Sequence, residues 1–167
     1  MNLMCQLPTP IDRLDESINQ LELCEKLILS TNAIERLCPM PKMVNLRILS
    51  LNRNSLKRLQ YLETVGSTLE QLWVNYNNID RLDNLQALPQ LHTLFIANNK
   101  IKNWDEVEKL SQCTELKVLL LTANPIYTAP TREGNWPMVV RRAPQLEVLD
   151  GVLVSAQIRT EAEALQL

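Results

Sequence analysis

The sequence predicts an α/β solenoid whose concave face is a parallel β-sheet and whose convex face consists of short helices or turns. Three observations predict this fold. Leucine recurs at fixed intervals, an asparagine follows each group of leucines at a constant distance, and the groups themselves repeat along the chain. One copy buries too little apolar surface to be stable, so the copies are expected to stack into a continuous core.

The repeat has the form L-x-x-L-x-L-x-x-N, with an apolar residue two positions after the asparagine, which is a leucine-rich repeat. Its inner L-x-L is expected to be a short strand with the leucines pointing inward, because strand side chains alternate between faces. An asparagine side chain both donates and accepts, so a stacked column of asparagines can satisfy the backbone groups of buried turns. The predicted column is Asn32, Asn54, Asn77, Asn99 and Asn124, with steps of 22, 23, 22 and 25 residues.

The repeat divides the chain into a leucine-rich-repeat domain over residues 1–151 and a tail over residues 152–167. Within the domain we expect a degenerate first copy at 1–20, five regular copies at 21–134 and a C-terminal cap at 135–151. A stack of repeats needs atypical ends, because its terminal copies would otherwise expose the core. The N-terminal end looks thinly covered, and the tail looks solvated and partly helical.

The segments between strands differ from copy to copy. The two prolines of 38–41 exclude a regular helix there. Helical turns are expected at 59–65 and 105–110, with Asn103 and Glu106 forming a capping box for the second. In the cap, Asn135 is expected to be the N-cap of a helix with a proline in its first turn.

Composition narrows the classes of partner. Hydrophobic residues make up 46% of the chain, but no run approaches the roughly 20 apolar residues of a membrane span. A formal charge of −2 creates no general attraction for nucleic acid. The start has neither a basic region nor a long apolar run, so it does not read as a signal peptide. We therefore expect no membrane or nucleic-acid partner and a reducing, intracellular compartment such as the cytoplasm.

The chain offers no catalytic or metal-binding constellation. Its four cysteines are scattered, without a C-x-x-C pair. Its only histidine, His92, is not part of a motif that would pair it with a catalytic nucleophile. The three glycines lie far apart, so no phosphate-binding loop is expected. We expect no metal, no cofactor and no enzymatic activity.

The variable positions of the repeat carry the candidate site. The third, fifth and seventh residues of L-x-x-L-x-L-x should face the concave side, where the core does not need them. An apolar patch with a polar rim is typical of a protein-binding site, although parallel sheets favour branched and aromatic residues in any case. The predicted patch is Trp73, Phe95 and Leu120 with Ile48 and Val118 beside them, and its rim includes Arg53 and Tyr76. Arg141 and Arg142 in the cap are further candidates, although such a pair is usually a solvated helix face.

Four segments resemble the axonemal dynein light chain 1 family of leucine-rich-repeat light chains. They are 24–32, 45–54, 62–73 and the cap from Asn135 to Gly151. The resemblance runs from about residue 6 to residue 152. The repeat is shared with many proteins, whereas the segment from Val65 to Trp73 is far more discriminating.

This resemblance implies a light chain of the outer arm dynein of motile cilia and flagella, located in the axoneme. The family binds the dynein heavy chain, at the microtubule-binding head of its stalk, which makes tubulin or the microtubule a second candidate partner. The matching contact residues are Trp73, Phe95 and Leu120, with Arg141, Arg142 and Arg159 as weaker candidates. The chain departs from the family in lacking most of a helical segment at the N-terminus and in its tail.

Two other binding functions are compatible with the repeat. One is a targeting subunit of a protein phosphatase, like the leucine-rich regulator of protein phosphatase 1, which has more copies than this chain. The other is a spliceosomal leucine-rich scaffold that holds an RNA-binding domain, for which a nuclear basic segment would be expected. A pull-down from axonemal extract would distinguish these from the light chain.

Overall fold

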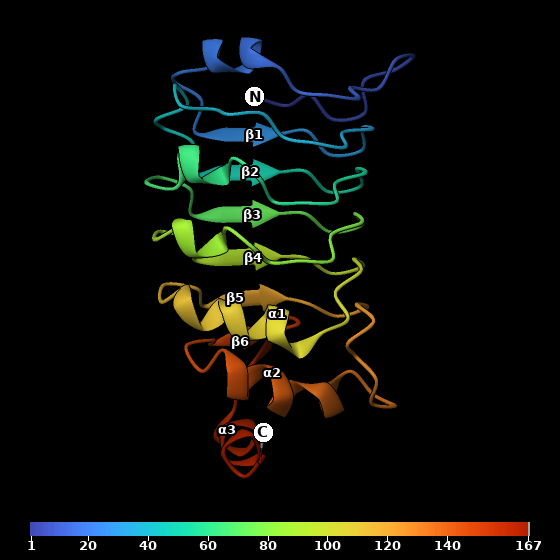
Figure 1. Ribbon diagram of the computed structural model, residues 1–167, viewed down its shortest axis with the longest axis vertical. Helices are drawn as coiled ribbons and strands as arrows, with labels where there is room; N and C mark the ends of the chain where they lie inside the picture. Colours follow the sequence, from blue (N-terminus) through green and yellow to red (C-terminus); the bar gives the residue numbers. More distant parts are fainter. Residues whose placement is uncertain (167) are drawn as a thin grey trace.

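The computed structural model describes residues 1–166 and confirms the predicted solenoid. Six short parallel strands follow one another in sequence order, and a seventh pairs antiparallel with the sixth (Figure 1). The strands are β1 (Lys26–Ile28), β2 (Ile48–Ser50), β3 (Gln71–Trp73), β4 (Thr93–Phe95), β5 (Val118–Leu120), β6 (Val148–Leu149) and β7 (Val152–Leu153). Each strand from β1 to β5 spans the third to fifth residues of its repeat, so it overlaps the predicted L-x-L strand but begins and ends one residue earlier.

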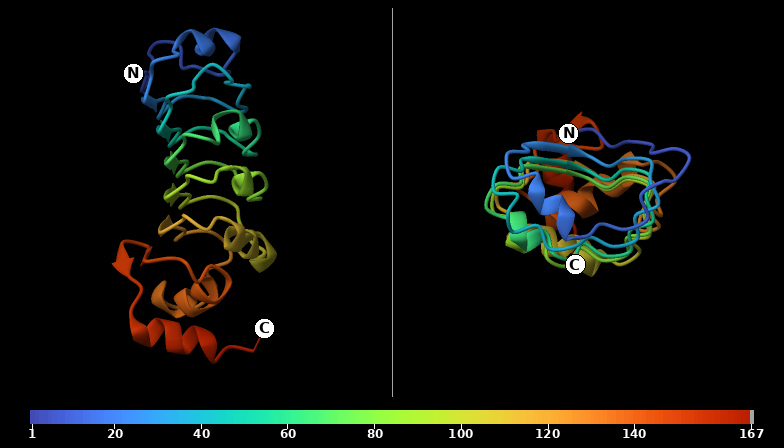
Figure 2. Two further views of the ribbon diagram at one scale, coloured as in Figure 1. Left: turned by 90° about the vertical axis from the view of Figure 1, so that its left-hand side faces the viewer. Right: turned by 90° about the horizontal axis from the view of Figure 1, so that it is seen from above.

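Short helices return the chain on the side opposite the sheet, as the view along the stack shows (Figure 2). The α-helices are α1 (Trp104–Glu108), α2 (Trp136–Arg142) and α3 (Ala156–Glu163). The 3₁₀-helices are Glu16–Gln20, Leu62–Val65, Leu85–Ala87, Lys109–Gln112 and Glu133–Asn135. Residues 38–41, which contain two prolines, form no helix, as predicted.

The core is a stack of leucines that runs the length of the sheet. The central leucine of every strand from β1 to β5 is fully buried, and successive ones face each other in register. The outer turns are packed equally tightly at one point. A Cβ at Gly66 would lie 2.2 Å from the carbonyl oxygen of Ala87, so no side chain fits there.

The residue before each column asparagine adopts a left-handed backbone conformation. These residues have φ between 55° and 58°, and none is glycine: Thr31, Arg53, Tyr76, Asn98 and Ala123. The left-handed region is unfavourable for L-residues with a side chain. Each turn therefore stores a small strain, which the hydrogen bonds of the next residue offset.

The N-terminal end is better covered than the sequence suggested. Residues 1–5 run beside β1, and the Leu3 amide donates to the carbonyl of Ile28 at 2.7 Å. The 3₁₀-helix Glu16–Gln20 buries Ile18 on the end of the core. The expectation of a thinly covered end was wrong, because backbone pairing needs no repeat motif and left no signal in the sequence.

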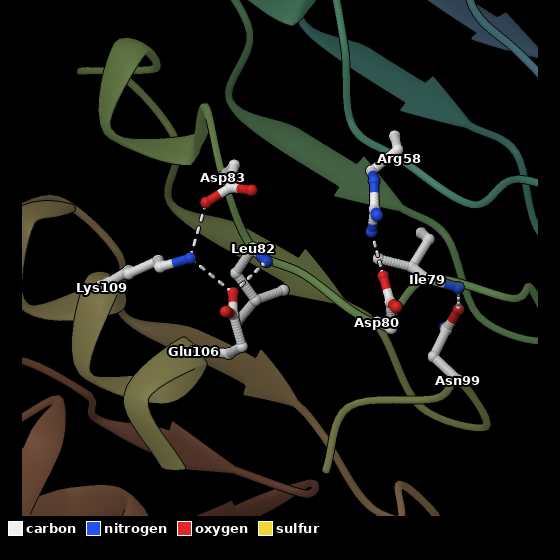
Figure 3. A network of polar contacts seen from close by, with 8 residues as sticks. All are labelled: Arg58, Ile79, Asp80, Leu82, Asp83, Asn99, Glu106 and Lys109. Carbon is white, nitrogen blue, oxygen red and sulfur yellow. Dashed lines mark hydrogen bonds and ion pairs between the residues drawn. The ribbon is translucent and has the colours of Figure 1, made fainter. Parts of the chain in front are cut away.

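Neither predicted side-chain cap forms. Asn103 and Asn135 precede α1 and α2, but their side chains make no capping hydrogen bond. The Glu106 carboxylate instead accepts from the Leu82 amide of the neighbouring turn at 2.8 Å and from Lys109 at 2.7 Å (Figure 3). Asn135 accepts from the Ala129 amide at 3.1 Å. A neighbouring turn thus takes the Glu106 carboxylate, and a loop residue six positions earlier takes the Asn135 side chain, so neither group is left for a helix cap.

The segment after Gly151 is partly helical and largely exposed, as predicted, but it packs onto the C-terminal cap. It forms β7 and then α3. The N-cap of α3 is Ser155, whose hydroxyl accepts a hydrogen bond from the Ile158 amide at 3.3 Å. Helix α3 packs against α2 and buries Ala162 to 3% exposure. Residues 152–166 therefore extend the C-terminal cap, and Leu167, the end of the predicted tail, lies outside the described residues.

Candidate partner-binding face

The parallel register places the fifth residues of successive repeats next to one another. Trp73 pairs with Phe95, and Phe95 pairs with Leu120. All three side chains are half-buried, whereas the leucines that alternate with them are fully buried. The alternation of strand side chains thus directs these three onto the concave face.

The two aromatic rings form a preorganised pair. Their centroids lie 6.0 Å apart with an interplanar angle of 21°, an offset stack. The Lys26 ammonium lies 5.6 Å from the Trp73 ring centroid, close enough for a cation–π interaction. The indole N–H of Trp73 is covered by its neighbours and has no hydrogen-bond partner within the described residues.

Ile48 and Val118 lie in the adjacent row of third positions. Ile48 pairs with Gln71 and Val118 with Thr93, so two polar residues separate them along that row. Both aliphatic side chains are half-buried. Each therefore extends the patch at one end: Ile48 lies in β2, next to the strand of Trp73, and Val118 lies in β5, the strand of Leu120.

The rim of the patch combines an arginine–tyrosine pair with a row of asparagine hydrogen bonds. The Arg53 guanidinium lies 4.9 Å from the Tyr76 ring centroid, and both residues are exposed. Asn52 accepts from the Asn75 amide, and Asn75 from the Ala97 amide, each at 2.8 Å. These rim asparagines thus hold neighbouring strands together. The remaining seventh positions include Ser30 and Ala97, which are buried rather than facing a partner.

The arginines of the cap are not part of this patch. Arg141 is exposed on α2 and lines a small groove with Arg159 of α3. The Arg142 side chain is only 11% exposed, lies over the Trp104 ring at 5.1 Å and contacts Glu108 at 3.6 Å. Arg159 donates to the Pro144 and Leu146 carbonyls at 2.9 and 2.8 Å. Arg142 and Arg159 therefore stabilise the cap, whereas Arg141 forms no ion pair or side-chain hydrogen bond within residues 1–166.

The column asparagines link each turn to the preceding one. Asn77 accepts from the Leu56 amide at 2.9 Å and donates to the carbonyls of Leu51 and Val74 at 3.0 and 3.1 Å. Asn54, Asn99 and Asn124 repeat the pattern, and all four are at most 9% exposed. Asn32 makes the same bonds to residues 3 and 11 but is half-buried. The column therefore sets the spacing of the strands that carry the patch.

Comparison with known proteins shows the family to which this chain belongs. The leucine-rich repeat family matches residues 51–166. Dynein axonemal light chain 1 of Chlamydomonas reinhardtii is 42% identical over an alignment of 158 residues, and the match covers 92% of this chain and 79% of the relative. The protein of that name from Homo sapiens is 42% identical over 155 residues, with 92% and 81% covered. The chain belongs to the axonemal dynein light chain 1 family. Its place is thus the axoneme of a cilium or flagellum, in the cytoskeleton, and its role is that of a dynein light chain.

Solved structures agree with the fold of this axonemal light chain. A chain of the Drosophila melanogaster SNF/U2A′ complex aligns with a TM-score of 0.76 over 92% of this chain and 91% of that chain, at 22% identity. An internalin of Listeria monocytogenes aligns with a TM-score of 0.67 over 87% of this chain and 39% of that chain, at 23% identity. At these identities the likeness concerns the fold alone.

One residue that matters in this light chain was missed by sequence reasoning. Asp150 occupies a fifth position and was placed on the concave face, but it is buried to 4% exposure. Its carboxylate accepts from the amides of Leu121 and Thr122, at 2.8 and 3.0 Å, and from Tyr127 and Trp136, at 2.8 and 3.0 Å. Burial, together with this carboxylate, raises the pKa of Tyr127 well above its usual range. The signal available in the sequence was an acidic residue at a fifth position, where most other repeats have an apolar residue.

The described part of the light chain gathers no metal site and no membrane span. No three His, Cys, Asp or Glu side chains come together within residues 1–166. No helix in that range is long and apolar enough to cross a bilayer. His92 is exposed and its Nδ1 lies 3.1 Å from the Thr93 hydroxyl. Burial raises the pKa of the Cys38 and Cys113 thiols, so the unreactive thiol form is favoured at both.

Proposed function

We propose that this chain is a non-catalytic light chain of outer arm axonemal dynein that binds the motor heavy chain through its concave face. The contacted part of the heavy chain is the microtubule-binding head of the stalk, which brings the light chain next to tubulin. The observation that carries the proposal is the stacked pair of Trp73 and Phe95, extended by Leu120, on the face that the core does not use. Family membership supplies the class of partner.

The geometry of the pair suits an interface anchor. An aromatic side chain buries about 150–250 Å² in a contact, and central aromatic anchors typically lose about 2 kcal/mol or more on truncation. Because the two rings already stack on a rigid sheet, less side-chain freedom is lost on binding. Arg53, Tyr76 and Lys26 surround the pair with the polar rim that such interfaces have. Arg141 is a peripheral candidate contact on the cap.

The test separates binding from folding. Trp73→Ala and Phe95→Ala should each weaken binding to a purified stalk-head fragment about thirtyfold, while thermal melts change little because both side chains are half-buried. Leu72→Ala is the folding control, since its cavity should cost about 2–5 kcal/mol. Tyr61→Ala removes an exposed aromatic residue outside the strands and should leave binding unchanged.

Two results would contradict the proposal. If Trp73→Ala unfolds the protein, the side chain belongs to the core rather than to an interface. If Trp73→Ala and Phe95→Ala bind the stalk head as the wild type does, the heavy chain contacts a different face. No observation favours a phosphatase-targeting or spliceosomal function over the light-chain function.

A further inference from the structure

A column of arginines runs along the return path of the first four repeats, beyond the asparagine turns. It consists of Arg13, Arg36, Arg58 and Arg81, of which the last three each lie four residues after a column asparagine. Every member is exposed and is followed by an apolar residue of the core or its margin. We call this set the arginine column.

Backbone hydrogen bonds hold the column in register. Neighbouring return segments are joined just before their arginines, and the amide of Glu35 also donates to the carbonyl of Asp12. The joining bonds are from Ala33 to Ile11 at 2.8 Å, from Ser55 to Ile34 at 2.9 Å and from Asn78 to Leu56 at 2.8 Å. Because these segments stack like strands, successive arginines are about 5 Å apart along the stack.

The column carries an excess of positive charge. The residue before each arginine is also charged; these residues are Asp12, Glu35, Lys57 and Asp80. Together with the arginine column, the eight positions hold five cations and three carboxylates. Two carboxylates are already engaged, Asp80 with Arg58 (Figure 3) and Glu35 with Lys57 at 4.0 Å. Within residues 1–166, Arg13, Arg36 and Arg81 form no ion pair. These eight positions therefore carry a net charge of +2 on a chain whose formal charge is −2, and two further carboxylates, Asp15 and Asp83, lie near Arg13 and Arg81.

Open grooves lie between the arginines. One is lined by the guanidinium groups of Arg13 and Arg36, the carboxylates of Asp12 and Glu35, and the side chains of Leu37, Pro39 and Tyr61. The next is lined by Arg36 and Arg58 together with Leu37 and Gln60. An extended chain lying across them would meet a guanidinium at each turn of the solenoid and an apolar floor in between.

We propose that the arginine column docks an acidic segment of another polypeptide, laid along the stack. Guanidinium groups bind carboxylates in bidentate geometry, and several in a line select a ligand with several carboxylates. A single phosphate would need the arginines to converge on one point, which their stacking prevents. Single-stranded nucleic acid uses several aromatic stacking platforms, whereas Tyr61 is the one aromatic residue in either groove. The column lies off the sheet, so this docking is independent of heavy-chain binding at the concave face.

The probe is a fluorescein-labelled peptide of glutamates, titrated with the full chain and followed by anisotropy at low and at physiological salt. We expect measurable binding that weakens as salt rises, because exposed charges are screened. The triple variant of Arg13, Arg36 and Arg81, each replaced by Gln, should bind about tenfold more weakly, since each exposed pair contributes a factor of a few. Glu35→Gln should strengthen binding, because it removes a competing carboxylate.

Matched controls keep the proposal independent of folding and of the concave face. Arg47→Gln removes an exposed arginine beside β2, which pairs with Glu70 at 2.9 Å, and should change binding less than twofold. Trp73→Ala should leave peptide binding intact while it weakens heavy-chain binding. Thermal melts of the triple variant should match the wild type. The proposal is overturned if the glutamate peptide does not bind at low salt, if the triple variant binds as tightly as the wild type, or if an oligothymidylate of equal charge binds more tightly.

Discussion

The middle of the stack and its C-terminal cap solve the same problem with opposite chemistry. In the middle, each turn is held by a neutral amide: Asn99 accepts from the Ile79 amide at 3.0 Å and donates to the carbonyls of Val74 and Ile96 at 2.9 and 3.1 Å. At the cap, the carboxylate of Asp150 only accepts, and it gathers four donors from three segments.

The difference follows from what lies beyond each turn. A middle turn has a copy of itself on either side, so a group that both donates and accepts can be repeated indefinitely. The last turn has no following copy, so its amides need an acceptor from elsewhere. The Asp150 carboxylate is this acceptor, and it also accepts hydrogen bonds from Tyr127 and Trp136. The cap therefore depends on a single residue, whereas in the middle of the stack several asparagines share this role.

The largest effect is expected from removing that residue. Asp150→Ala should leave two backbone amides, the Tyr127 hydroxyl and the Trp136 indole N–H without an acceptor in a buried site. Each unsatisfied donor costs about 1–3 kcal/mol, so we expect a loss of roughly 3–5 kcal/mol in the free energy of unfolding, measured by chemical denaturation. Asp150→Asn should fall between Ala and the wild type, because its oxygen can still serve the amides. A variant with an unchanged midpoint would show that the cap does not depend on this carboxylate.

Removing a column asparagine should cost less. Asn77→Ala and Asn99→Ala should each lower the free energy of unfolding by about 1–3 kcal/mol, since one turn loses its side-chain partners. Asn124→Ala should also loosen the cap, because this turn leads into it. Asn32→Ala should cost least, since water reaches that half-buried site. Equal midpoints for all four variants and the wild type would mean that water replaces the column without loss.

A gain of stability is expected in the turns themselves. Thr31 has a φ of 58°, and its side chain is exposed, so Thr31→Gly relieves the left-handed conformation without removing a packing contact. We expect a gain of about 0.5–1 kcal/mol after the extra entropy of glycine in the unfolded chain is subtracted. Asn98→Gly is the matched control and should gain less, because asparagine tolerates this region. A loss of stability in Thr31→Gly would show that the turn is not strained.

The smallest effect concerns the pH dependence of the contact between Asp83 and Lys109 (Figure 3). This contact joins the segment after Asn77 to the helical segment after Asn99. Hydrogen bonding to Lys109 lowers the pKa of Asp83 below 3.8, and the reverse contact raises the pKa of Lys109 above 10.5. The pair's stability is present at neutral pH and is lost as acid protonates Asp83 or as strong base deprotonates Lys109. The free energy of unfolding should fall between pH 7 and pH 3 by a few tenths of a kcal/mol less in Asp83→Asn than in the wild type. The effect is small because both side chains of the pair are partly exposed. An unchanged acid dependence in denaturation midpoints would assign no role to the contact.

The regular part of the fold could be predicted because its determinants are local and repeated. The L-x-L motif places every strand from β1 to β5, and one register then follows for all of them. The same alternation brings Trp73, Phe95 and Leu120 side by side. Their role as a partner site is still a prediction, since a row of apolar side chains defines a surface but not its occupant.

The ends could not be predicted because their contacts are long-range and occur once. Asp150 reads as one more variable position until Tyr127 and Trp136 are known to converge on it. Glu106 has the spacing of a capping box, yet the Leu82 amide from the neighbouring turn captures its carboxylate. Arg142 reads as a solvated cation, but its guanidinium lies on Trp104. In each case a partner distant in sequence outcompetes the local pattern.

The missing side chain at Gly66 has a consequence for the opposite face of the molecule. Adjacent outer turns are in contact where Gly66 meets the Ala87 carbonyl, and the space between them admits only the glycine hydrogen. Even a methyl group there would act as a wedge that opens the convex side and bends the sheet more sharply. The bend would fall between β3 and β4, the strands of Trp73 and Phe95. The curvature that a partner meets is therefore set partly by an atom that is absent from the far side of the solenoid.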